Sequence, residues 1–432
     1  MTSLWQNTEQ KRYPSLEKEI STDVLIIGGG MAGILCAKAL KDKGIDCVIT
    51  EAKYIGSGVS GKTTAVVSAQ HDILYSDIVR KFDDETAKLY LTSNLRGLNR
   101  IKELSEKYPC DFEEIPTVVF SQNNADKMKE EVYTLRRFGF NARFISDIPL
   151  PISCKGGVVF PKQGQIHPIK LIQTIAKELT VYENTFIKRI ENNIAYTNKH
   201  KIKANKIIIA THFPFINKYG LFPVKLYQNR SYVIALKNAP LIHGSYADNS
   251  ISDFYFRSYK NLLLVGGGDH RTGKCKGGYE TLREFIRKNF PDAIEEYAWS
   301  TQDCMSLDGL PYIGRYSPSL PNVYVATGFN EWGMTPSAVA AELLCNLITQ
   351  TENKYEKIYS PSRSILHPQL LANAANTIVD FLYPTAKRCS HLGCSLKYNK
   401  FEHSYDCPCH GSRFDENGAL LDNPATKNAK IK

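Results

Sequence analysis

The stretch that decides the fold is STDVLIIGGGMAGILCAKALKDKGIDCVITEAK, residues 21–53. Its apolar, β-branched segment 23–27 predicts a buried parallel strand, and a helical pattern follows from about Met31 to Lys43. A second predicted strand, DCVIT, ends directly before Glu51. Strand, glycine turn, helix, strand and acid arrive in the order of the βαβ unit that opens a doubly wound α/β sheet.

The glycines of this stretch have separate physical roles. Gly28, Gly30 and Gly33 complete the pattern G-x-G-x-x-G. The first permits a tight turn, the second lets the backbone approach a pyrophosphate, and the third lets helix and strand pack closely. The helix N-terminus offers amides and partial positive charge to phosphates. Glu51 can accept hydrogen bonds from the adenosine ribose, which disfavours a 2′-phosphate. The sequence therefore predicts FAD or NAD rather than NADP.

Three later segments favour FAD. Residues 52–71, AKYIGSGVSGKTTAVVSAQH, are too polar for a core strand and suit a loop that wraps a phosphate and a ring system. A strand within 202–214 ends in Ala210 and Thr211, at cofactor distance in such a sheet. Segment 308–348 holds a strand, a glycine turn and an Ala- and Leu-rich helix, whose N-terminus would point at the cofactor.

Together these segments resemble the D-amino-acid-oxidase-like family of FAD-dependent oxidoreductases, which includes glycine, sarcosine and glutamylputrescine oxidases. The resemblance covers roughly residues 20–350 and includes GQIHPIKLIQTIAKEL, 164–179. It implies an α/β FAD-binding domain of the Rossmann-like, glutathione-reductase type, with an inserted α+β substrate domain built on an antiparallel sheet. The expected FAD-binding segments are 20–85, 156–225 and 301–350, and the expected substrate-domain segments are 86–155 and 226–300.

The resemblance also implies which residues contact FAD. Glu51 would hold the ribose, the loop around Ser60 the flavin and phosphates, the backbone of Ile187 the adenine, and the turn at 328–335 the isoalloxazine edge and ribityl chain. The implied FAD contacts are Gly28, Gly30, Met31, Ala32, Gly33, Glu51, Ser60, Thr63, Thr64, Ile187, Ala210, Thr211, Gly328, Phe329, Gly333, Met334 and Thr335.

A second glycine triplet, Gly266–Gly268, also follows a strand. The residues after it, DHRTGKCKGG, are polar and not helical. We interpret the triplet as a hairpin or loop edge of the inserted domain and predict no pyridine-nucleotide site there.

Composition narrows the class of protein. The chain has 432 residues and a net charge of +10, spread without a long basic block, so we expect a solvated surface and no nucleic-acid partner. The polar N-terminal stretch 1–19 and the lack of a long apolar run predict a cytoplasmic protein with no signal peptide and no membrane insertion. In a reducing compartment, cysteines scattered through the first 350 residues would be buried free thiols. These are Cys36, Cys47, Cys110, Cys154, Cys275, Cys304 and Cys345.

The other four cysteines lie in CSHLGCSLKYNKFEHSYDCPCHGS, residues 389–412, after a polar segment that we expect to be a linker at 351–372. A C-x-H pair and a C-x-x-H pair stand 15 residues apart. Two thiolates can hold one iron and two neutral imidazoles a second, and imidazole ligation raises the reduction potential. The alternatives are zinc, whose pairs are usually C-x₂₋₄-C or H-x₃₋₅-H, and a scaffold held by disulfides alone.

This stretch resembles the Rieske [2Fe–2S] signature. The resemblance implies a disulfide between Cys394 and Cys409, and it leaves His403 as a solvent-facing loop residue. Rieske domains usually have a larger β-base, so we expect 373–432 to form a small, shortened β domain that depends on docking against the flavoprotein part. The implied cluster ligands are Cys389, His391, Cys407 and His410.

Five residues are candidates for the chemistry at the flavin. Arg257 could clamp a substrate carboxylate or form a structural ion pair, and Tyr255 lies on the same face of its strand. His71 could contact flavin or substrate, or be a core histidine. Lys62 could stabilise negative charge on reduced flavin. Cys304 is considered for covalent flavin attachment, but its offset does not match clearly.

The predicted function is oxidation of the C–N bond of a small-molecule amine or amino acid. Electrons would pass from FAD to the Rieske cluster and on to an external acceptor, a protein or a quinone. A pure oxidase needs no cluster, so a dehydrogenase is favoured. The alternatives are a flavin/iron–sulfur electron-transfer or redox-sensing protein without an amine substrate, and an enzyme in which electrons enter at the cluster. A closed pocket with an arginine and a tyrosine would favour the enzyme.

Overall fold

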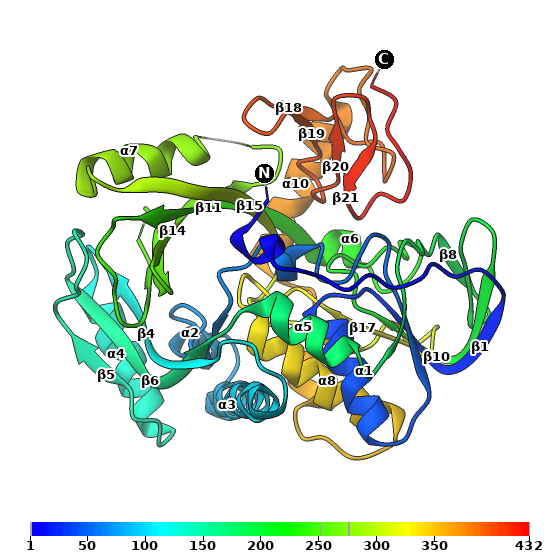
Figure 1. The fold of residues 1–432 in the computed structure, drawn as a ribbon, viewed down its shortest axis with the longest axis horizontal. Helices are drawn as coiled ribbons and strands as arrows, with labels where there is room; N and C mark the ends of the chain where they lie inside the picture. Colours follow the sequence, from blue (N-terminus) through cyan, green and yellow to red (C-terminus); the bar gives the residue numbers. More distant parts are fainter. Residues whose placement is uncertain (1, 251, 275–276, 432) are drawn as a thin grey trace.

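The computed structural model describes residues 2–250, 252–274 and 277–431. In these residues the chain forms three sheets, of eight, nine and four strands, with helices packed against the two larger ones (Figure 1). The scattered cysteines within the described residues are free thiols, and all but the half-buried Cys154 are buried. Cys275 lies outside the described residues.

The first sheet is the doubly wound sheet that the glycine-rich stretch predicts. The five consecutive strands from β17 to β7 run parallel, and the edge strand β16 joins antiparallel. Alternate residues enter different cores: Ile26 and Ile208 pack in one apolar cluster, and Leu25 and Ile207 in another. Both faces of the central strands are thus buried, which explains their unbroken apolar sequence. The strand order is β16 (Tyr312–Arg315), β17 (Val323–Thr327), β10 (Lys201–Ile209), β1 (Ile20–Ile27), β2 (Cys47–Thr50) and β7 (Thr180–Tyr182), with β8 (Arg189–Glu191) and β9 (Ile194–Tyr196) beside β10.

The glycine turn between β1 and α1 (Met31–Asp42) has the predicted geometry. Gly28 has φ +112°, a conformation that favours glycine, and a Cβ there would overlap the carbonyl oxygen of Ala210. A Cβ on Gly33 would overlap the carbonyl oxygen of Gly28, so this glycine allows the helix to lie close to the strand. Helix α1 packs beside α8 (Met334–Ile348), which follows the second glycine turn.

The second sheet is antiparallel except where β12 pairs with β4, and it forms the inserted domain. Helices α4 (Ala125–Arg137) and α7 (Tyr279–Asn289) pack on this sheet (Figure 1). Helix α3 (Asp84–Lys107) packs against α8 and β6, and α2 (Tyr75–Lys81) packs against α3 and α4. The strand order of the second sheet is β15 (Ile294–Ser306), β11 (Leu226–Lys237), β14 (Leu262–Arg271), β13 (Tyr255–Tyr259), β12 (Ser245–Asp248), β4 (Glu113–Ser121), β6 (Gly156–Gln165) and β3 (Val66–Val67), with β5 (Arg143–Ile145) beside β6.

Two strands pair across the expected domain boundaries. Strand β6 and strand β3 fall in the segments 156–225 and 20–85 that we expected in the FAD-binding domain, but both pair within the second sheet. The reason is the long β4–β6 ladder, which extends from Glu113 to Ser121 and takes residues 156–165 with it. Helix α5 (Pro168–Ala176) then returns the chain to the first sheet.

The glycine triplet 266–268 lies inside strand β14, as the hairpin interpretation expects. Gly266 is directly opposite Tyr255 of β13, and a Cβ on Gly266 would overlap the tyrosine ring. The missing side chain therefore makes room for Tyr255, and the triplet shapes the sheet around an aromatic residue.

The C-terminal part is small, as predicted. Its sheet consists of four short antiparallel strands, β18 (Lys397–Asn399), β19 (Ser404–Asp406), β20 (Arg413–Asp415) and β21 (Leu420–Asp422). Helix α10 (Pro368–Leu382) precedes it and crosses the expected boundary between residues 372 and 373, while α9 (Glu356–Tyr359) lies within the expected linker. The linker is thus partly helical. None of the described helices is long and apolar enough to cross a membrane.

Helix α10 packs through its polar side. Asn373 and Asp380 are buried, and Asn373 accepts a hydrogen bond from Arg271 of β14 at 2.8 Å. Leu371 and Ile378 remain 74% and 59% exposed. The helix is held against the second sheet by polar contacts, so the C-terminal part reaches the flavoprotein part through hydrogen bonds more than through an apolar core.

We predict that Gly33→Ala destabilises the fold by at least about 2 kcal/mol, because the added methyl group must displace backbone. Gly58→Ala is the matched control, since Gly58 has φ −83° and an added Cβ would meet nothing within 4 Å. The free energies of unfolding in urea check this. Equal losses in the two variants would contradict the packing role.

Candidate functional site

A cavity of about 410 Å³, here called the fingerprint cavity, opens where β1 and β10 end. Its wall includes the glycine turn, the loop 57–63, the ends of β10 and β17, and residues from β21 onward in the C-terminal part. Fourteen of the predicted contacts line it: Gly28, Gly30, Met31, Ala32, Glu51, Ser60, Thr63, Ile187, Ala210, Thr211, Gly328, Phe329, Gly333 and Met334.

Side chains at the glycine turn are fixed by backbone amides. The Glu51 carboxylate accepts hydrogen bonds from the amides of Gly29, at 2.8 Å, and Lys53, at 2.9 Å. Burial raises the pKa of Glu51, and these amides oppose the rise. The Met31 amide, at the start of α1, donates to Ser60 Oγ at 2.9 Å. This end of the cavity therefore presents a fixed acceptor and a helix N-terminus, as a dinucleotide requires.

Three consecutive backbone carbonyls at the end of this loop accept hydrogen bonds from side chains of other segments. Those of Lys62, Thr63 and Thr64 accept hydrogen bonds from Trp299 Nε1 at 2.7 Å, Trp5 Nε1 at 2.6 Å, and Arg257 Nη1, respectively. Trp5 lies in the short helix η1 (Leu4–Asn7) and is fully buried. A distant N-terminal segment thus fixes the loop that lines the cavity.

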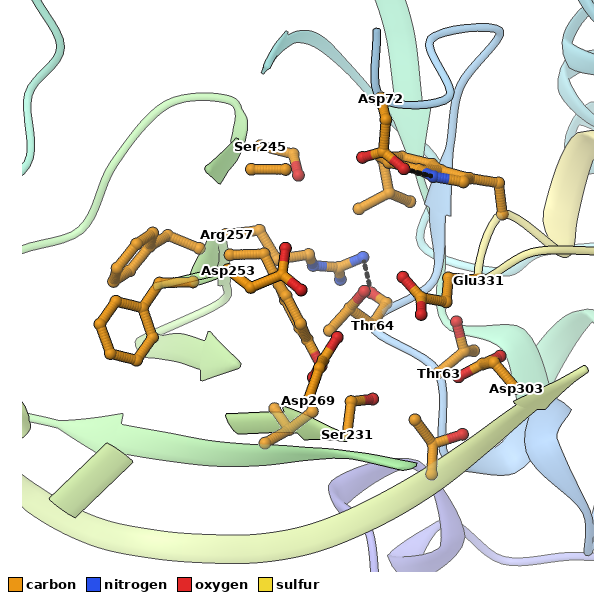
Figure 2. Close-up of a pocket in the computed structure, with 18 of the residues that line it drawn as sticks. Thr63, Thr64, Asp72, Ser231, Ser245, Asp253, Arg257, Asp269, Asp303 and Glu331 are labelled. Carbon is orange, nitrogen blue, oxygen red and sulfur yellow. Dashed lines mark hydrogen bonds between the residues drawn. The ribbon is translucent and has the colours of Figure 1, made fainter. Parts of the chain in front are cut away.

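A smaller cavity of about 90 Å³, here called the acidic cavity, adjoins the first and lies under the second sheet (Figure 2). Both cavities are bordered by Thr63, Gly333 and Met334. Its other lining residues include Tyr255, Arg257 and a group of carboxylates, namely Asp72, Asp248, Asp253, Asp269, Asp303 and Glu331.

Arg257 is 1% exposed, and burial lowers its pKa to about 9. Its Nη1 is engaged by Thr64, whereas its buried Nε and Nη2 have no hydrogen-bond partner among the described residues. Nε and Nη2 form one edge of the guanidinium, which is the edge that binds a carboxylate with two parallel hydrogen bonds. Tyr255 lines the same cavity, and burial keeps its pKa well above the usual value, so it stays protonated.

The candidate cluster ligands of the C-terminal part lie in two pairs, one of cysteines and one of histidines. The Cys389 and Cys407 thiols are free and buried, and they hydrogen-bond to each other. The His391 and His410 rings lie edge to face with centroids 5.0 Å apart, and the buried Nδ1 atom of each has no hydrogen-bond partner among the residues that the structure describes. These donors are two thiols and two imidazole nitrogens, the set that a mixed thiolate–imidazole iron centre needs.

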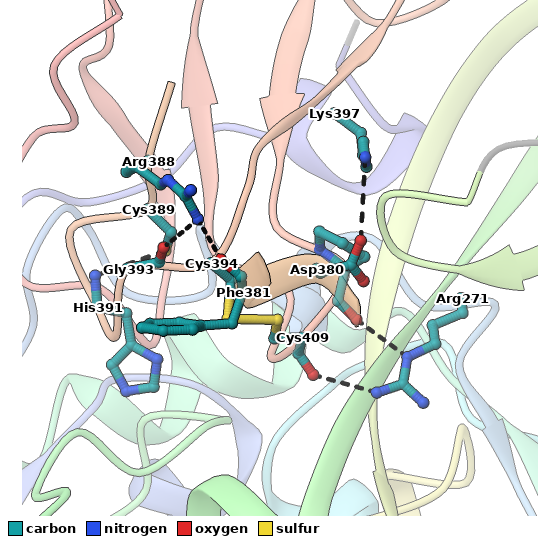
Figure 3. The surroundings of a disulfide bond; sticks show 11 residues. Arg271, Asp380, Phe381, Arg388, Cys389, His391, Gly393, Cys394, Lys397 and Cys409 are labelled. Atoms are coloured by element: carbon teal, nitrogen blue, oxygen red, sulfur yellow. Dashed lines mark hydrogen bonds and ion pairs between the residues drawn. A yellow bond between two sulfur atoms is a disulfide. The ribbon is translucent and has the colours of Figure 1, made fainter. Parts of the chain in front are cut away.

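The remaining two cysteines, Cys394 and Cys409, form a disulfide that joins the two ligand loops (Figure 3). They are therefore not available to a metal, although Cys407 Sγ lies within 4.8 Å of both. The His403 side chain is 73% exposed and bonds to Glu416, away from the other histidines. With the disulfide formed, the cluster offers two thiolates and not the four ligands of a Cys-rich zinc site.

The two histidines face the flavoprotein part. His391 Nε2 lies 2.8 Å from Asn217 Oδ1, and His410 hydrogen-bonds to the backbone of Pro223. The Phe213 ring lies edge-on to both imidazoles, with centroids 6.5 and 6.3 Å away. Phe213 follows β10 by four residues, so the cluster ligands sit directly behind the wall of the fingerprint cavity.

Further contacts fix this arrangement. Asn423 Nδ2 donates to the carbonyls of Thr211 and Phe213, at 2.6 and 2.9 Å. Gln302, which lines the fingerprint cavity, donates to the Gly411 carbonyl at 2.9 Å. Arg230 and Glu402 form a buried ion pair across the same interface. The C-terminal part thus closes one side of the cavity.

Comparison with known proteins identifies these parts. The model of the family described as DAO, FAD dependent oxidoreductase, matches residues 23–347. The chain belongs to this family. The model of the Rieske [2Fe-2S] domain matches residues 376–431. The DAO-type part therefore binds FAD, and the Rieske domain binds a [2Fe–2S] cluster.

Individual proteins agree with this assignment. The chain is 32% identical to YhfW of Bacillus subtilis, a protein named for a Rieske 2Fe-2S iron–sulfur centre, over 98% of this chain and 96% of that one. It is 24% identical to the gamma-glutamylputrescine oxidoreductase of Escherichia coli, over 80% and 87% of the two chains. Among solved structures, glycine oxidase from Geobacillus kaustophilus covers 80% of this chain at 21% identity and TM-score 0.68, with 99% of its own length aligned.

Within this DAO-type protein, two of the catalytic candidates lie apart from the acidic cavity. His71 lines neither cavity: its Nδ1 lies 2.7 Å from Tyr90 Oη and its Nε2 3.1 Å from Thr335 Oγ1, so it is a core histidine. Lys62 lines the fingerprint cavity, and burial lowers its pKa while Asp422 of the Rieske domain opposes that shift. It is placed where a charge next to FAD would act.

Three predicted FAD contacts do not line the fingerprint cavity. Gly33 and Thr335 are packing residues, and Thr335 donates to the Ser68 carbonyl at 2.7 Å. Thr64 lines the acidic cavity instead. Cys304 lines the fingerprint cavity, but burial raises its pKa to about 12, so the thiol is protonated and a poor nucleophile.

Sequence reasoning missed the carboxylates of the acidic cavity, Trp5, and the part of the cavity wall that comes from the Rieske domain. Trp5 could have been recognised as a buried residue, since it is a lone tryptophan in an otherwise polar segment. The acids carried none, because they lie on separate strands and turns that only the second sheet brings together.

We predict that Trp5→Phe weakens FAD binding about fivefold, because the ring is kept while the hydrogen bond to the Thr63 carbonyl, worth about 1 kcal/mol, is lost. Tyr133→Phe, whose residue is 65% exposed on α4, is the control. FAD titration of the apoprotein by fluorescence measures the affinity. Unchanged affinity in Trp5→Phe would contradict a role for η1 in holding the loop.

We predict that His391→Ala abolishes the [2Fe–2S] cluster, because it removes one of the two imidazole ligands, whereas His403→Ala leaves it intact. Iron and sulfide analysis and the electron paramagnetic resonance spectrum of the reduced protein measure the outcome. Iron loss in both variants, or retention in both, would refute the ligand assignment.

Proposed function

We propose that this protein is an FAD-dependent amine or amino-acid dehydrogenase whose electrons leave through the Rieske cluster to an external acceptor. The observation that carries the proposal is the position of Phe213. It lies edge-on to both cluster histidines and comes two residues after Thr211, which lines the fingerprint cavity. A two-electron site and a one-electron site therefore share one wall.

The substrate side of the proposal rests on the acidic cavity. Its border with the fingerprint cavity supports a position for a small molecule next to the flavin. The free edge of Arg257 suits a carboxylate, and Tyr255 adds a protonated hydroxyl on the same wall. A cavity with both residues favours an enzyme over an electron-transfer protein without a small-molecule substrate.

When bound, FAD supplies a two-electron hydride acceptor and the [2Fe–2S] cluster a one-electron carrier. The protein's own residues orient and desolvate the substrate. The substrate carbon loses a hydride and its nitrogen a proton, which leaves an imine. The carboxylates of Asp303 and Glu331 line both cavities and so lie beside the reacting amine. They favour loss of that proton, since their raised pKa values make them better bases.

For electron transfer, the polypeptide supplies a short, ordered connection between the wall of the fingerprint cavity and the cluster histidines. Thr211 and Phe213 are both held by Asn423 of the Rieske domain, and His391 and His410 contact Phe213. His391 is also tied to Asn217, so the imidazole edges face inward to the flavoprotein part. This orientation supports transfer from FAD to the cluster within one chain.

The names of related proteins support the substrate class. They include a gamma-glutamylputrescine oxidoreductase, a glycine oxidase and an L-proline dehydrogenase, which act on amines or amino acids.

We predict that one or more members of a panel of amines and amino acids bleaches the flavin without oxygen and, in the same sample, produces the spectrum of a reduced Rieske cluster. Stopped-flow absorbance and freeze-quenched paramagnetic resonance measure the two events. Dithionite added to a parallel sample confirms that the cluster is present and reducible. Bleaching without cluster reduction would refute the electron path, and the absence of bleaching with every compound would favour the electron-transfer alternative.

A further inference from the structure

The acidic cavity carries far more negative than positive charge. Asp72, Asp253, Asp269, Asp303 and Glu331 line it, against the one guanidinium of Arg257 (Figure 2). Among the described residues, none of these five carboxylates forms an ion pair. The Asp72 carboxylate accepts one hydrogen bond, from Trp332 Nε1 at 3.2 Å, and the buried Oδ1 of Asp269 has no partner.

This crowding is unfavourable without a cation. Partial desolvation at the cavity wall and then the neighbouring carboxylates raise the pKa of Asp253 to about 6, and both effects also raise the pKa values of Asp269 and Glu331. Burial raises the pKa of Asp303 to about 7, although Arg230 opposes it. A bound cation would relieve the repulsion, and Arg257 is the only cationic side chain among the described residues of the cavity wall.

The five carboxylates fall into two groups according to the cavities that they line. Asp303 and Glu331 belong to both cavities and so lie at the border with the flavin site. Asp72, Asp253 and Asp269 line only the acidic cavity. The reacting amine must be at the border, so the outer three carboxylates face a part of the substrate that does not react.

A second, independent observation comes from Arg257. Its guanidinium is 1% exposed, lines the same cavity, and keeps Nε and Nη2 without partners. A buried guanidinium edge of this kind needs an acceptor. The cavity therefore offers a place for one anionic group and, separately, for more than one cationic group.

We propose that the substrate is a diamino compound with a carboxylate: the carboxylate binds Arg257, one amine is oxidised at the flavin, and the second ammonium is held by Asp72, Asp253 and Asp269. This rests on the proposed function for the oxidation step, and it extends that function to a substrate class. The chemistry is unchanged: a hydride leaves the carbon next to the reacting nitrogen, a proton leaves that nitrogen, and the second ammonium takes no part.

Three compounds of matched length test the proposal on the holoenzyme. Ornithine has both amines and the carboxylate, norvaline lacks the distal amine, and 1,4-diaminobutane lacks the carboxylate. Equilibrium binding is measured without air from the perturbation of the flavin spectrum, and flavin bleaching is measured in the same cuvette. We expect ornithine to bind at least tenfold more tightly than either of the others.

Two variants remove charge from the outer carboxylates, Asp269→Asn and Asp253→Asn. Each is expected to weaken ornithine binding about tenfold and norvaline binding less than twofold. Asp253 is exposed to solvent in the cavity wall, so its variant keeps the test valid if Asp269→Asn folds poorly. Asp292→Asn, an exposed residue outside both cavities, is the control for the same change in net charge.

The outcomes separate the two proposals. Norvaline binding as tightly as ornithine, or equal losses for both compounds in the variants, overturns the diamino substrate class and leaves amine oxidation standing. Tight, Asp269-dependent binding of ornithine with no bleaching supports the cation site and counts against the oxidation. If 1,4-diaminobutane binds as tightly as ornithine, the carboxylate half of the proposal is wrong.

Discussion

The docking of the Rieske domain onto the wall of the FAD cavity is the constraint on which the rest of the structure depends. The domain's own apolar cluster has few members, and several of these are the cysteines themselves. Its position is set by polar contacts: the buried pair Arg230–Glu402 and the amides of Gln302 and Asn423. Removing one partner of such a buried ion pair costs about 3–5 kcal/mol, so the interface tolerates little change. The Rieske domain can therefore be small, because its position is held by polar contacts with the flavoprotein part and not by a large core of its own.

The same docking explains how two kinds of redox chemistry can share the chain. The FAD site needs a dry wall beside a pocket for a small molecule, and the cluster needs its imidazoles within reach of an electron source. The end of β10 serves both, because Thr211 faces the cavity and Phe213 faces the histidines. The inserted sheet then brings Arg257 and the carboxylates to the other side of the flavin site.

Local sequence determined what could be predicted. The β1–α1–β2 unit and the glycine roles follow from residues close together in the chain, where spacing and residue type fix the geometry. The four cluster ligands were implied by the resemblance to the Rieske signature. The disulfide between Cys394 and Cys409 followed from the resemblance and is present. The acidic cavity could not be predicted, because Asp72, Asp253 and Glu331 come from distant loops. Strand pairing, which is non-local, joins β6 to the second sheet across the boundary expected at residue 156.

The disulfide between Cys394 and Cys409 affects how the [2Fe–2S] cluster can be lost and rebuilt. It joins the two ligand loops through a covalent bond that does not involve iron, so Cys389 and Cys407 stay near each other whether or not the metal is held. Loss of iron under scarcity or oxidative damage would then leave a pre-assembled receptor, and repair would require delivery of iron and sulfide but no refolding of the domain.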